Sequence, residues 1–458
     1  MGRRGTGRIG TDGTEDGMGK AKTAATRAKM TALAVAVLAT ACQQQAPTAT
    51  APVDGGYQAK LQERLLDAKP GDVIEIPAGR HVFDRSLSLR VDGVTLRGAG
   101  MDKTILSFKG QKSGAEGLLV NAGNFTLENL AIEDSKGDGL KVNEGDNITI
   151  RGVRVEWTRG PHTSNGAYGL YPVQASNVLI EDCVVIGASD AGIYVGQSNN
   201  IVVRRNRVER NVAGIEIENS VGADVHDNLA TGNTGGILVF NMPNLPVPGH
   251  STRVFKNRVI ANNHDNFAAK GAAVASVPAG SGVVINSNDK VEIFDNDIAG
   301  NRTANVIVSS YWSTGYMNKY GVAKDYDPYP EQIAVFGNRF SGGGDSPDGF
   351  DLKALKLALY GLGGHLPDVL WDGYANPKLA TGPQICVRDA SGLINADGPN
   401  KYANPSHVDL AAPDGAAFRC TLQRLPAIAL AAPAAAPGAG VVAAPAAAVA
   451  PATAVPQG

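Results

Sequence analysis

The sequence predicts an all-β protein built as a single-stranded right-handed parallel β-helix, a solenoid of stacked coils. Three stretches with one layout follow each other: NVLIEDCVVIGASDAGIYVGQS, NIVVRRNRVERNVAGIEIENS and GADVHDNLATGNTGGILVFNM. Gly192, Gly214 and Gly236 recur every 22 residues, and each opens a strand in which alternate residues are apolar. One such unit cannot bury its apolar face alone, whereas stacked units share a continuous core.

A second recurring marker supports a unit of 22 or 23 residues with insertions. The marker precedes apolar-alternating strands at Asn129, Gly152, Cys183, Asn206, Asn228, Asn257, Asn296 and Asn338. Asparagines in successive coils can stack their amides and satisfy the backbone groups of the turns. We therefore interpret this column as structural rather than catalytic.

The β-helix is expected over residues 57–345, with a cap at each end because an open coil is an unpaired sheet edge. Helical spacing of apolar residues before Pro70 predicts an N-terminal cap helix that contains Tyr57, Leu61, Leu65 and Ala68. The leucine-rich segment from Asp351 to Tyr360 predicts a second helix. With the irregular Gly/Pro-rich region after it, this helix is assigned to a C-terminal cap over residues 346–425.

The first 56 residues indicate export. Residues 1–41 are predicted to be a signal peptide with a possible start-site extension, because the apolar run from Met30 to Ala41 follows several cations and is too short to span a bilayer. The small residues before Cys42 resemble the bacterial lipoprotein box, which implies a lipidated Cys42, a tether over 42–56 and a location in the periplasm or outer membrane. Plain secretion stays open, since Ala39 stands where the box prefers leucine.

The charge and the cysteines of the chain indicate which partners, disulfides and cofactors to expect. Lys plus Arg is 42 and Asp plus Glu is 44, so no basic excess is available for nucleic acid. Cys386 and Cys420 are expected to pair in an oxidising compartment, leaving Cys183 as a buried thiol. We expect no metal and no cofactor, because the histidines lack ligand spacing and no Cys/His cluster exists.

The uncharged Ala/Pro-rich residues 426–458 are predicted to be a disordered tail.

Four segments carry a resemblance to a known family over roughly residues 57–425. They are NGAYGLYPVQ from Asn165, SDAGIYVGQS from Ser189, NVAGIEIENS from Asn211 and NTGGILVF from Asn233. The chain resembles the pectin-lyase-like right-handed β-helix superfamily and, more closely, a family of exported bacterial β-helix lipoproteins of unassigned activity. The resemblance implies a polysaccharide ligand and an exported cytochrome-c-like protein as a possible partner.

The enzyme motifs of that superfamily are only partly present. Mannuronan epimerases carry Tyr-Gly-Phe-Asp-Pro-His, and the segment from Tyr168 to Val173 is similar in outline. Tyr171 stands in place of the acid and Val173 in place of the histidine, so Tyr168 alone is kept. None of the seven histidines lies between two glycines, as the polygalacturonase-like motif requires.

Strand alternation and the positions of the insertions predict a binding groove. Alternation directs Glu216 and Glu218 outward, and aligned coils form the outer column Lys141, Tyr171, Tyr194, Glu216 and Leu238. Insertions fall before this strand at residues 159–167 and 261–281, and after it at residues 241–250 and 311–330. Such loops on both sides would form the walls of a groove along the column.

Each candidate group has two interpretations. Tyr311 and Trp312 either stack on sugar rings or pack their loop onto the solenoid. Glu216 and Glu218 are either a solvated sheet face or a base or Ca²⁺ ligand. His162 is either an exposed loop residue or the base that works with Tyr168 in β-elimination from a uronate.

Three functions follow from these candidates. The leading hypothesis is a monomeric cell-envelope lipoprotein that binds polysaccharide or a similar extended ligand through Lys141, Tyr171, Tyr194, Glu218, Tyr311 and Trp312. The second is a lyase or epimerase acting on uronate polymers through Tyr168, His162 and Glu216. The third is a non-catalytic scaffold for an exported cytochrome-c-like partner.

Overall fold

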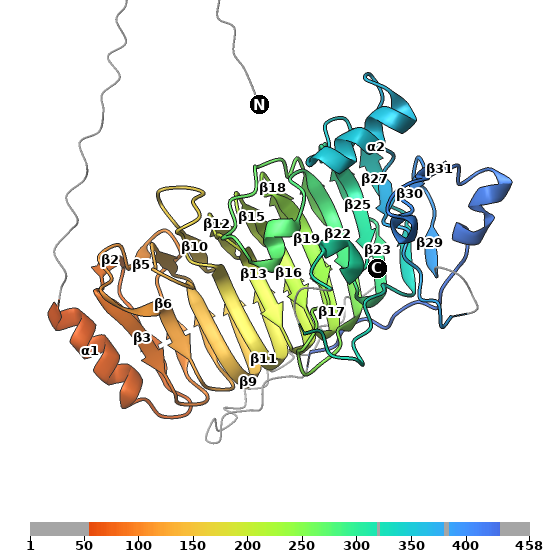
Figure 1. The fold of residues 1–458 in the computed structure, drawn as a ribbon. Coiled ribbons are helices and arrows are strands. Elements are labelled where there is room, and N and C mark those ends of the chain that lie inside the picture. Colours follow the sequence, from red (N-terminus) through yellow and green to blue (C-terminus); the bar gives the residue numbers. More distant parts are fainter. Residues whose placement is uncertain (1–54, 318–320, 380–383, 431–458) are drawn as a thin grey trace, which may run out of the picture. The chain divides into compact units, whose positions relative to one another are not determined.

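The structure is a computed structural model that describes residues 55–317, 321–379 and 384–430. These residues form a right-handed β-solenoid of about 12 turns with parallel strands stacked along its axis (Figure 1). The predicted all-β parallel β-helix is confirmed. Among the described residues, no helix is long and apolar enough to cross a membrane. The signal segment and Cys42 lie outside the described residues.

A typical coil contributes one strand to each of three columns. The first column consists of β3 (Arg85–Leu89), β6 (Ser113–Val120), β9 (Leu140–Arg151), β11 (Tyr168–Glu181), β13 (Ala191–Gly196), β16 (Ala213–Glu218), β19 (Gly235–Phe240), β22 (Ser281–Asn286), β25 (Ala304–Ser309), β28 (Val369–Trp371) and β30 (Leu393–Asn395). The second consists of β1 (Val73–Glu75), β4 (Thr95–Arg97), β7 (Thr126–Glu128), the later halves of β9 and β11, β14 (Asn199–Arg204), β17 (Val221–His226), β20 (His250–Phe255), β23 (Asp289–Phe294), β26 (Ile333–Phe336) and β29 (Ile385–Val387).

The third column is a separate ten-stranded sheet. It consists of β2 (Gly79–Val82), β5 (Thr104–Ser107), β8 (Ala131–Glu133), β10 (Arg154–Glu156), β12 (Val184–Ile186), β15 (Arg207–Glu209), β18 (Leu229–Thr231), β21 (Arg258–Ile260), β24 (Asp297–Ala299) and β27 (Arg339–Ser341). Because β9 and β11 run on from the first column into the second, those two columns form one sheet, which has 21 strands when β31 is included. A short strand, β31 (Ser406–Val408), pairs antiparallel with β30 at the C-terminal end.

The recurring glycines of the first column allow successive coils to approach closely. A Cβ atom on Gly192 would lie 2.8 Å from the carbonyl oxygen of Gly214, and one on Gly214 would lie 2.5 Å from that of Gly236. Both distances are too short for a side chain. The 22-residue recurrence of glycine therefore reflects steric exclusion between stacked backbones rather than turn geometry.

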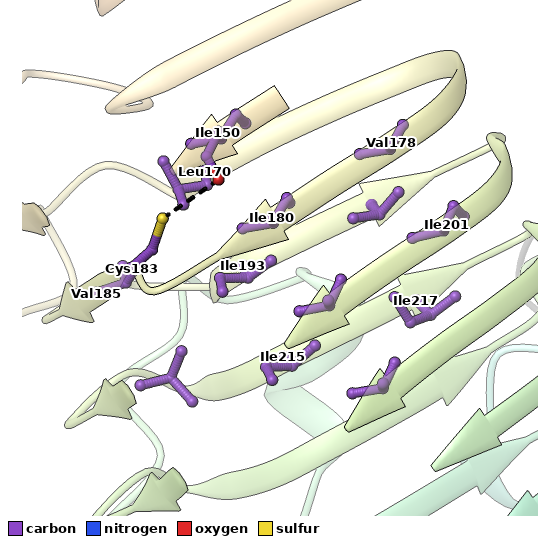
Figure 2. Packing of buried hydrophobic residues seen from close by; sticks show 14 of the residues in the cluster. Ile150, Leu170, Val178, Ile180, Cys183, Val185, Ile193, Ile201, Ile215 and Ile217 are labelled. Carbon is purple, nitrogen blue, oxygen red and sulfur yellow. Dashed lines mark hydrogen bonds between the residues drawn. The ribbon is translucent and has the colours of Figure 1, made fainter. Parts of the chain in front are cut away.

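The solenoid core is formed by the inward residues of the columns. Ile193, Ile215 and Ile237 lie in register on β13, β16 and β19 and are fully buried. Figure 2 shows this packing, with Cys183 inside it and its thiol directed at the carbonyl oxygen of Ile150, 3.7 Å away. Burial raises the pKa of the Cys183 thiol to about 12, so it is an inert core residue.

The predicted asparagine column forms a hydrogen-bonded ladder, but two of its predicted positions do not belong to it. Asn206 accepts a hydrogen bond from the backbone of Cys183, and its amide donates to Asn228 at 3.0 Å. The same pattern continues along the coils through Asn257, Asn296 and Asn338. Asn129 and Gly152 do not belong to this ladder. They have positive φ angles, as do Asp182 and Arg205, because the turn requires a left-handed residue just before each ladder position.

A second ladder was not predicted. Asn211 donates to Asn233 at 3.0 Å, Asn233 to Asn262 at 2.9 Å, and Asn262 to Asn301 at 3.2 Å. These residues precede the strands of the first column, and their amides also donate to backbone carbonyls of the third column. The ladder therefore fixes the turn that leads into each first-column strand.

One α-helix lies at the N-terminal coil and another packs on the outer face of the first column. Helix α1 (Gly55–Leu66) covers the N-terminal coil with the buried Leu61 and Leu65. Helix α2 (Phe350–Tyr360) lies toward the C-terminal end. The described residues also form four short 3₁₀ helices: η1 (Ala273–Ser276), η2 (Tyr311–Thr314), η3 (Gly398–Asn400) and η4 (Pro413–Phe418). The pair Cys386 and Cys420 is joined by a disulfide.

The chain after this disulfide packs along the second column. Arg424 Nε lies 2.9 Å from Glu292 Oε1, and the backbone nitrogen of Ile428 donates to Asp224 Oδ2 at 3.1 Å. Contacts with the solenoid therefore extend past residue 425, as far as Ala429, whose carbonyl oxygen accepts a hydrogen bond from Asn200 at 3.2 Å. Residues 431–458 of the predicted tail lie outside the described residues.

Candidate functional site: a tyrosine–carboxylate cluster

The register of the first column confirms the predicted outer order. Lys141 pairs with Tyr171, Tyr194 with Glu216, and Glu216 with Leu238. Beyond Leu238 the same position is occupied by Val284, Ile307, Leu370 and Ile394. The outer face is therefore polar and aromatic toward the N-terminal end and aliphatic toward the C-terminal end.

Three tyrosines pack against one another on the polar part of this face. The ring centroid of Tyr168 lies 4.5 Å from that of Tyr171 and 4.5 Å from that of Tyr194. The rings of Tyr171 and Tyr194 meet edge-on, with 4.9 Å between their centroids. Lys141 Nζ lies 4.9 Å from the centroid of Tyr171, within cation–π range. Tyr194 is 4 % exposed, while Tyr168 and Tyr171 are only partly buried. Two of the three rings therefore reach solvent.

Gly196 determines where the Tyr194 side chain lies. A Cβ on Gly196 would fall 2.4 Å from the hydroxyl oxygen of Tyr194, so the tyrosine ring occupies the space above the glycine. In that position the Tyr194 hydroxyl donates to Glu218 Oε1 on the next coil at 2.7 Å. A glycine on one strand thus brings a tyrosine and a carboxylate of neighbouring coils together.

Glu216 is the most buried polar group of the site. It is 1 % exposed, and its Oε2 atom has no hydrogen-bond partner. Its neighbours in register, Tyr194 and Leu238, belong to a buried apolar cluster that includes Val277 of the loop over residues 261–281. The interpretation of Glu216 as part of a solvated sheet face is therefore wrong, because this loop and the neighbouring side chains exclude water from it.

Burial and mutual repulsion raise the pKa values of the carboxyls. Burial is the main cause for Glu216, followed by the charges of Asp190 and Glu218. The pKa of Asp190 rises to about 7 for the same reasons, and that of Glu218 is also raised by burial. Each of the three groups is therefore easier to protonate than an exposed carboxyl.

Asp138 extends the group toward the N-terminal end. Its Oδ1 accepts a hydrogen bond from the backbone nitrogen of Tyr168 at 3.1 Å, and burial raises its pKa to about 6. Burial and the nearby carboxylates also raise the pKa values of Tyr168 and Tyr194, and that of Tyr171 to about 12. All three tyrosines are thus neutral hydroxyl groups at physiological pH. The tyrosine–carboxylate cluster is defined as Tyr168, Tyr171, Tyr194, Asp138, Asp190, Glu216 and Glu218.

The sequence missed Asp138 and Asp190. Both stand just before a first-column strand, where an aspartate is usually interpreted as a turn residue. One sequence feature could have identified them. Both aspartates stand just before a glycine and an apolar residue that begin a first-column strand, and the outer face of that strand carries a lysine or a tyrosine. Among the described residues, no group of three or more His, Cys, Asp or Glu is arranged to hold a metal ion.

The structure does not place His162 in this cluster. Its imidazole Nδ1 lies 2.9 Å from Ser164 Oγ within an exposed loop. Asn165 anchors that loop to the next coil by donating to the carbonyl oxygen of Gly187 at 2.6 Å. Of the predicted catalytic residues, Tyr168 and Glu216 come together and His162 stays apart.

The predicted aromatic wall is mainly a packing element. Tyr311 is 3 % exposed and meets the ring of Tyr326, whose hydroxyl donates to the carbonyl oxygen of Asn241 at 2.6 Å. Trp312 stacks on Tyr374 with 6.3 Å between centroids. The Tyr326 hydrogen bond joins the insertion at 311–330 to the loop at 241–250, and the Trp312 stack joins it to Tyr374, so these contacts hold the wall in place.

A cavity of about 880 Å³ occupies the aliphatic part of the same face. Val284, Ile307 and Leu370 line it along the first column. The loop around η1, the η2 segment and α2 supply its other sides. Asp372 also lines the cavity, but its carboxylate already accepts hydrogen bonds from the backbone and hydroxyl of Ser310 at 2.6 and 2.8 Å.

Comparison with known proteins agrees with this architecture. A family model described as the right handed beta helix region matches residues 92–247. The chain is a right-handed parallel β-helix protein. No curated protein matches its sequence.

The chain is similar to several solved structures. The A-module of the Azotobacter vinelandii mannuronan C-5 epimerase AlgE6 is 19% identical, with a TM-score of 0.42, over 66% of this chain and 82% of its own. An alginate lyase from Paenibacillus sp. is 16% identical, with a TM-score of 0.38, over 62% and 94%. The catalytic unit of a Streptomyces thermodiastaticus α-1,3-glucanase is 15% identical, with a TM-score of 0.41, over 69% and 47%. The likeness to this β-helix protein is one of fold.

Proposed function

We propose that this β-helix protein belongs to the bacterial cell envelope and binds a polysaccharide along its first column, with the tyrosine–carboxylate cluster as the contact site. The observation that carries the proposal is the cluster itself: packed tyrosine rings, two of them reaching solvent, surrounded by carboxyl groups that accept hydrogen bonds. Sugar hydroxyls donate to carboxyl oxygens, and aromatic rings pack on the apolar faces of sugars.

The arrangement of the coils suits an extended ligand. Neighbouring strands in a sheet lie about 4.8 Å apart, so a chain that follows the column meets one coil after another. Lys141, Tyr171 and Tyr194 occupy the outer position of three successive coils. The ligand would lie across these coils, with the loop at residues 159–167 beside them.

Binding is tested with the purified full-length protein on a panel of polysaccharides. Tyr171→Ala removes a partly exposed ring and the Lys141 contact, and we expect at least a tenfold loss of affinity. Tyr374→Ala is the matched control, because this tyrosine packs on Trp312 away from the cluster. Binding that is equally strong in Tyr171→Ala would remove the cluster as the contact site.

The second candidate function is acid–base chemistry on the bound saccharide. The observation that favours it is the buried carboxyl of Glu216. A buried carboxyl without a hydrogen-bond partner destabilises a fold, and such groups concentrate at functional sites. In a lyase, a carboxylate such as Glu218 would take the proton from the carbon next to the uronate carboxylate. The neutral Tyr168 hydroxyl would protonate the leaving oxygen as the carbon–oxygen bond breaks and a carbon–carbon double bond forms.

The same samples distinguish binding from catalysis. Ultraviolet absorbance of unsaturated ends reports a lyase, and proton exchange at the carbon with altered stereochemistry reports an epimerase. Loss of product in Glu218→Gln with retained binding would assign Glu218 to the proton transfer. The scaffold for an exported cytochrome-c-like partner remains a further prediction, checked by co-purification from native membranes.

A further inference from the structure

The cavity on the aliphatic part of the first column offers a ligand mainly apolar contacts. Its floor contains Val284, Ile307 and Leu370, which are partners in register on β22, β25 and β28. Neighbouring strands lie about 4.8 Å apart, so this row of branched aliphatic side chains extends about 10 Å along the solenoid axis. Leu355 of α2 and Val277 of the loop over residues 261–281 line other sides. A volume of about 880 Å³ suits a molecule of small-ligand size.

The polar groups that line the cavity already have partners. Asn286 Nδ2 donates to the Ser309 hydroxyl at 2.9 Å, and Asp348 Oδ2 accepts a hydrogen bond from the backbone nitrogen of Ala279 at 3.0 Å. Among the described residues, no lining residue has a buried side-chain polar atom that lacks a partner. The cavity differs in this from the tyrosine–carboxylate cluster, where Oε2 of Glu216 is unpartnered. The contacts left for a ligand of the cavity are therefore apolar ones.

Exposed apolar side chains gather on α2 and at the rim of the cavity. Phe350 and Tyr402 line the cavity and are 83 % and 46 % exposed. Leu357 on α2 is 53 % exposed, and Leu362 just after the helix is 88 % exposed. These are four of the six large apolar side chains that are exposed in the described part of the chain. Single exposed apolar residues are ordinary, whereas a group of them beside an apolar cavity indicates an interaction site.

A lipid surface accounts for both the cavity and the exposed residues. A soluble apolar molecule in the cavity would leave Leu357 and Leu362 in water, whereas a lipid surface would cover them while one of its acyl chains enters. An acyl chain has no hydrogen-bonding groups, and each methylene group that it buries against the aliphatic floor adds to the affinity. On α2 itself Lys353 and Lys356 stand against Asp351, so lipid phosphates meet no net negative charge on the helix.

We propose that the cavity binds an acyl chain of a membrane lipid and that α2 meets the lipid surface from which the chain enters. Val284, Ile307 and Leu370 form the floor on which the acyl chain lies. Phe350 and Tyr402 flank its entry, and the lipid headgroup stays outside. The cavity is separate from the tyrosine–carboxylate cluster, so this inference does not depend on the proposed saccharide binding.

The cavity is tested with delipidated full-length protein and cis-parinaric acid, a straight-chain fatty acid whose fluorescence rises in an apolar site. We expect saturable binding that palmitate displaces. Ala354→Trp places an indole at the cavity wall from an exposed position on α2, and the affinity should fall at least tenfold. Lys353→Trp is the matched control, because this neighbour is exposed and does not line the cavity, and its affinity should stay within threefold.

Thermal unfolding checks that both variants keep the fold. Absence of saturable binding by the wild-type protein would overturn the proposal whether or not the variants fold. Equal affinity of Ala354→Trp and Lys353→Trp would overturn the cavity as the site, because the two indoles differ in whether they enter it.

The lipid surface is tested with vesicles of phosphatidylethanolamine and phosphatidylglycerol that contain a parinaroyl phospholipid. Trp312 and Trp371 are next in sequence to residues that line the cavity, so energy transfer from tryptophan to the parinaroyl chain reports its entry. Leu357→Ser with Leu362→Ser removes exposed side chains that do not line the cavity. Energy transfer should fall at least fivefold in this double variant, while its affinity for soluble parinaric acid stays within threefold.

Leu66→Ser with Val73→Ser is the matched control at the N-terminal end, where both side chains are also exposed. It should keep the energy transfer of the wild-type protein. All variants carry the same N-terminal segment, so that any anchor there contributes equally. Equal energy transfer in the two double variants would overturn α2 as the part that meets the lipid surface.

Discussion

The two halves of the first column share one backbone and differ in what they display. From Lys141 to Glu216 the outer position carries a cation, two tyrosines and a carboxyl, whereas from Leu238 to Leu370 it carries aliphatic side chains. The inward positions are apolar throughout. In a solenoid the inward residues, glycines and asparagine ladders specify the coil, so the outward residues are free to differ.

The coverage of the two halves differs as well. The polar half keeps Tyr168 and Tyr171 partly exposed, while the aliphatic half lies beneath the η1 loop and α2 and borders the cavity. Glu216 and Leu238 mark the boundary, as direct partners on β16 and β19. Substituting leucine by glutamate at position 238, and glutamate by leucine at position 216, tests whether the outer face changes from polar to apolar between these two strands.

Leu238→Glu should have the largest effect. The side chain is fully buried beside Val277 and is the register partner of Glu216, so a carboxylate there would be desolvated next to a second buried carboxyl. We expect a loss of about 3–5 kcal/mol in the free energy of unfolding, measured by denaturant titration at neutral pH. Leu238→Met, which nearly conserves volume, is the control and should cost less than about 1.5 kcal/mol. Equal stability of the two variants would mean that the aliphatic half tolerates charge.

The pH dependence of stability should come from the polar half. Asp138 has a folded-state pKa of about 6 against an ordinary value of 3.8. Between these values the native state holds a proton that the unfolded chain has released, so stability falls as the pH rises from about 4 to 6. A shift of two units corresponds to at most about 3 kcal/mol, and partial exposure of Asp138 reduces the expected fall to about 1–2 kcal/mol.

Thermal and denaturant unfolding over this pH range measure the effect. Asp138→Asn keeps an acceptor for the backbone nitrogen of Tyr168 and should remove its share of the slope. Asp190, with a pKa of about 7, continues the fall to higher pH. An unchanged slope in Asp138→Asn would show that its carboxyl does not titrate in this range.

Glu216→Leu should have the opposite sign to Leu238→Glu. It replaces a buried carboxyl whose Oε2 has no partner by a side chain that suits its apolar neighbours. We expect a gain of about 1–3 kcal/mol in the free energy of unfolding at neutral pH, together with weaker saccharide binding. A destabilised Glu216→Leu protein would indicate that the carboxyl has stabilising contacts in solution.

The contrast between the halves explains what the sequence could predict. Period and alternation predicted the solenoid and the order Lys141, Tyr171, Tyr194, Glu216, because strand geometry relates sequence position directly to facing. They did not predict that Glu216 is buried, since its cover comes from a loop about 60 residues further along the chain. The prediction that His162 works with Tyr168 came from their proximity in sequence. In the structure the imidazole of His162 instead contacts the Ser164 hydroxyl within its own loop. Burial and loop contacts depend on tertiary packing that a repeat does not encode.

Gly196→Ala should have the smallest effect on stability and a specific effect on the site. The new methyl group would lie 2.4 Å from the Tyr194 hydroxyl oxygen, so the ring must move and its hydrogen bond to Glu218 must break. We expect a loss of about 1 kcal/mol in stability, close to the net value of one hydrogen bond, and weaker saccharide binding. Tyr194→Phe removes the same hydrogen bond without moving the ring. If Gly196→Ala weakens binding more than Tyr194→Phe does, the position of the ring matters beyond its hydroxyl; equal effects would assign the role of Gly196 to that hydrogen bond alone.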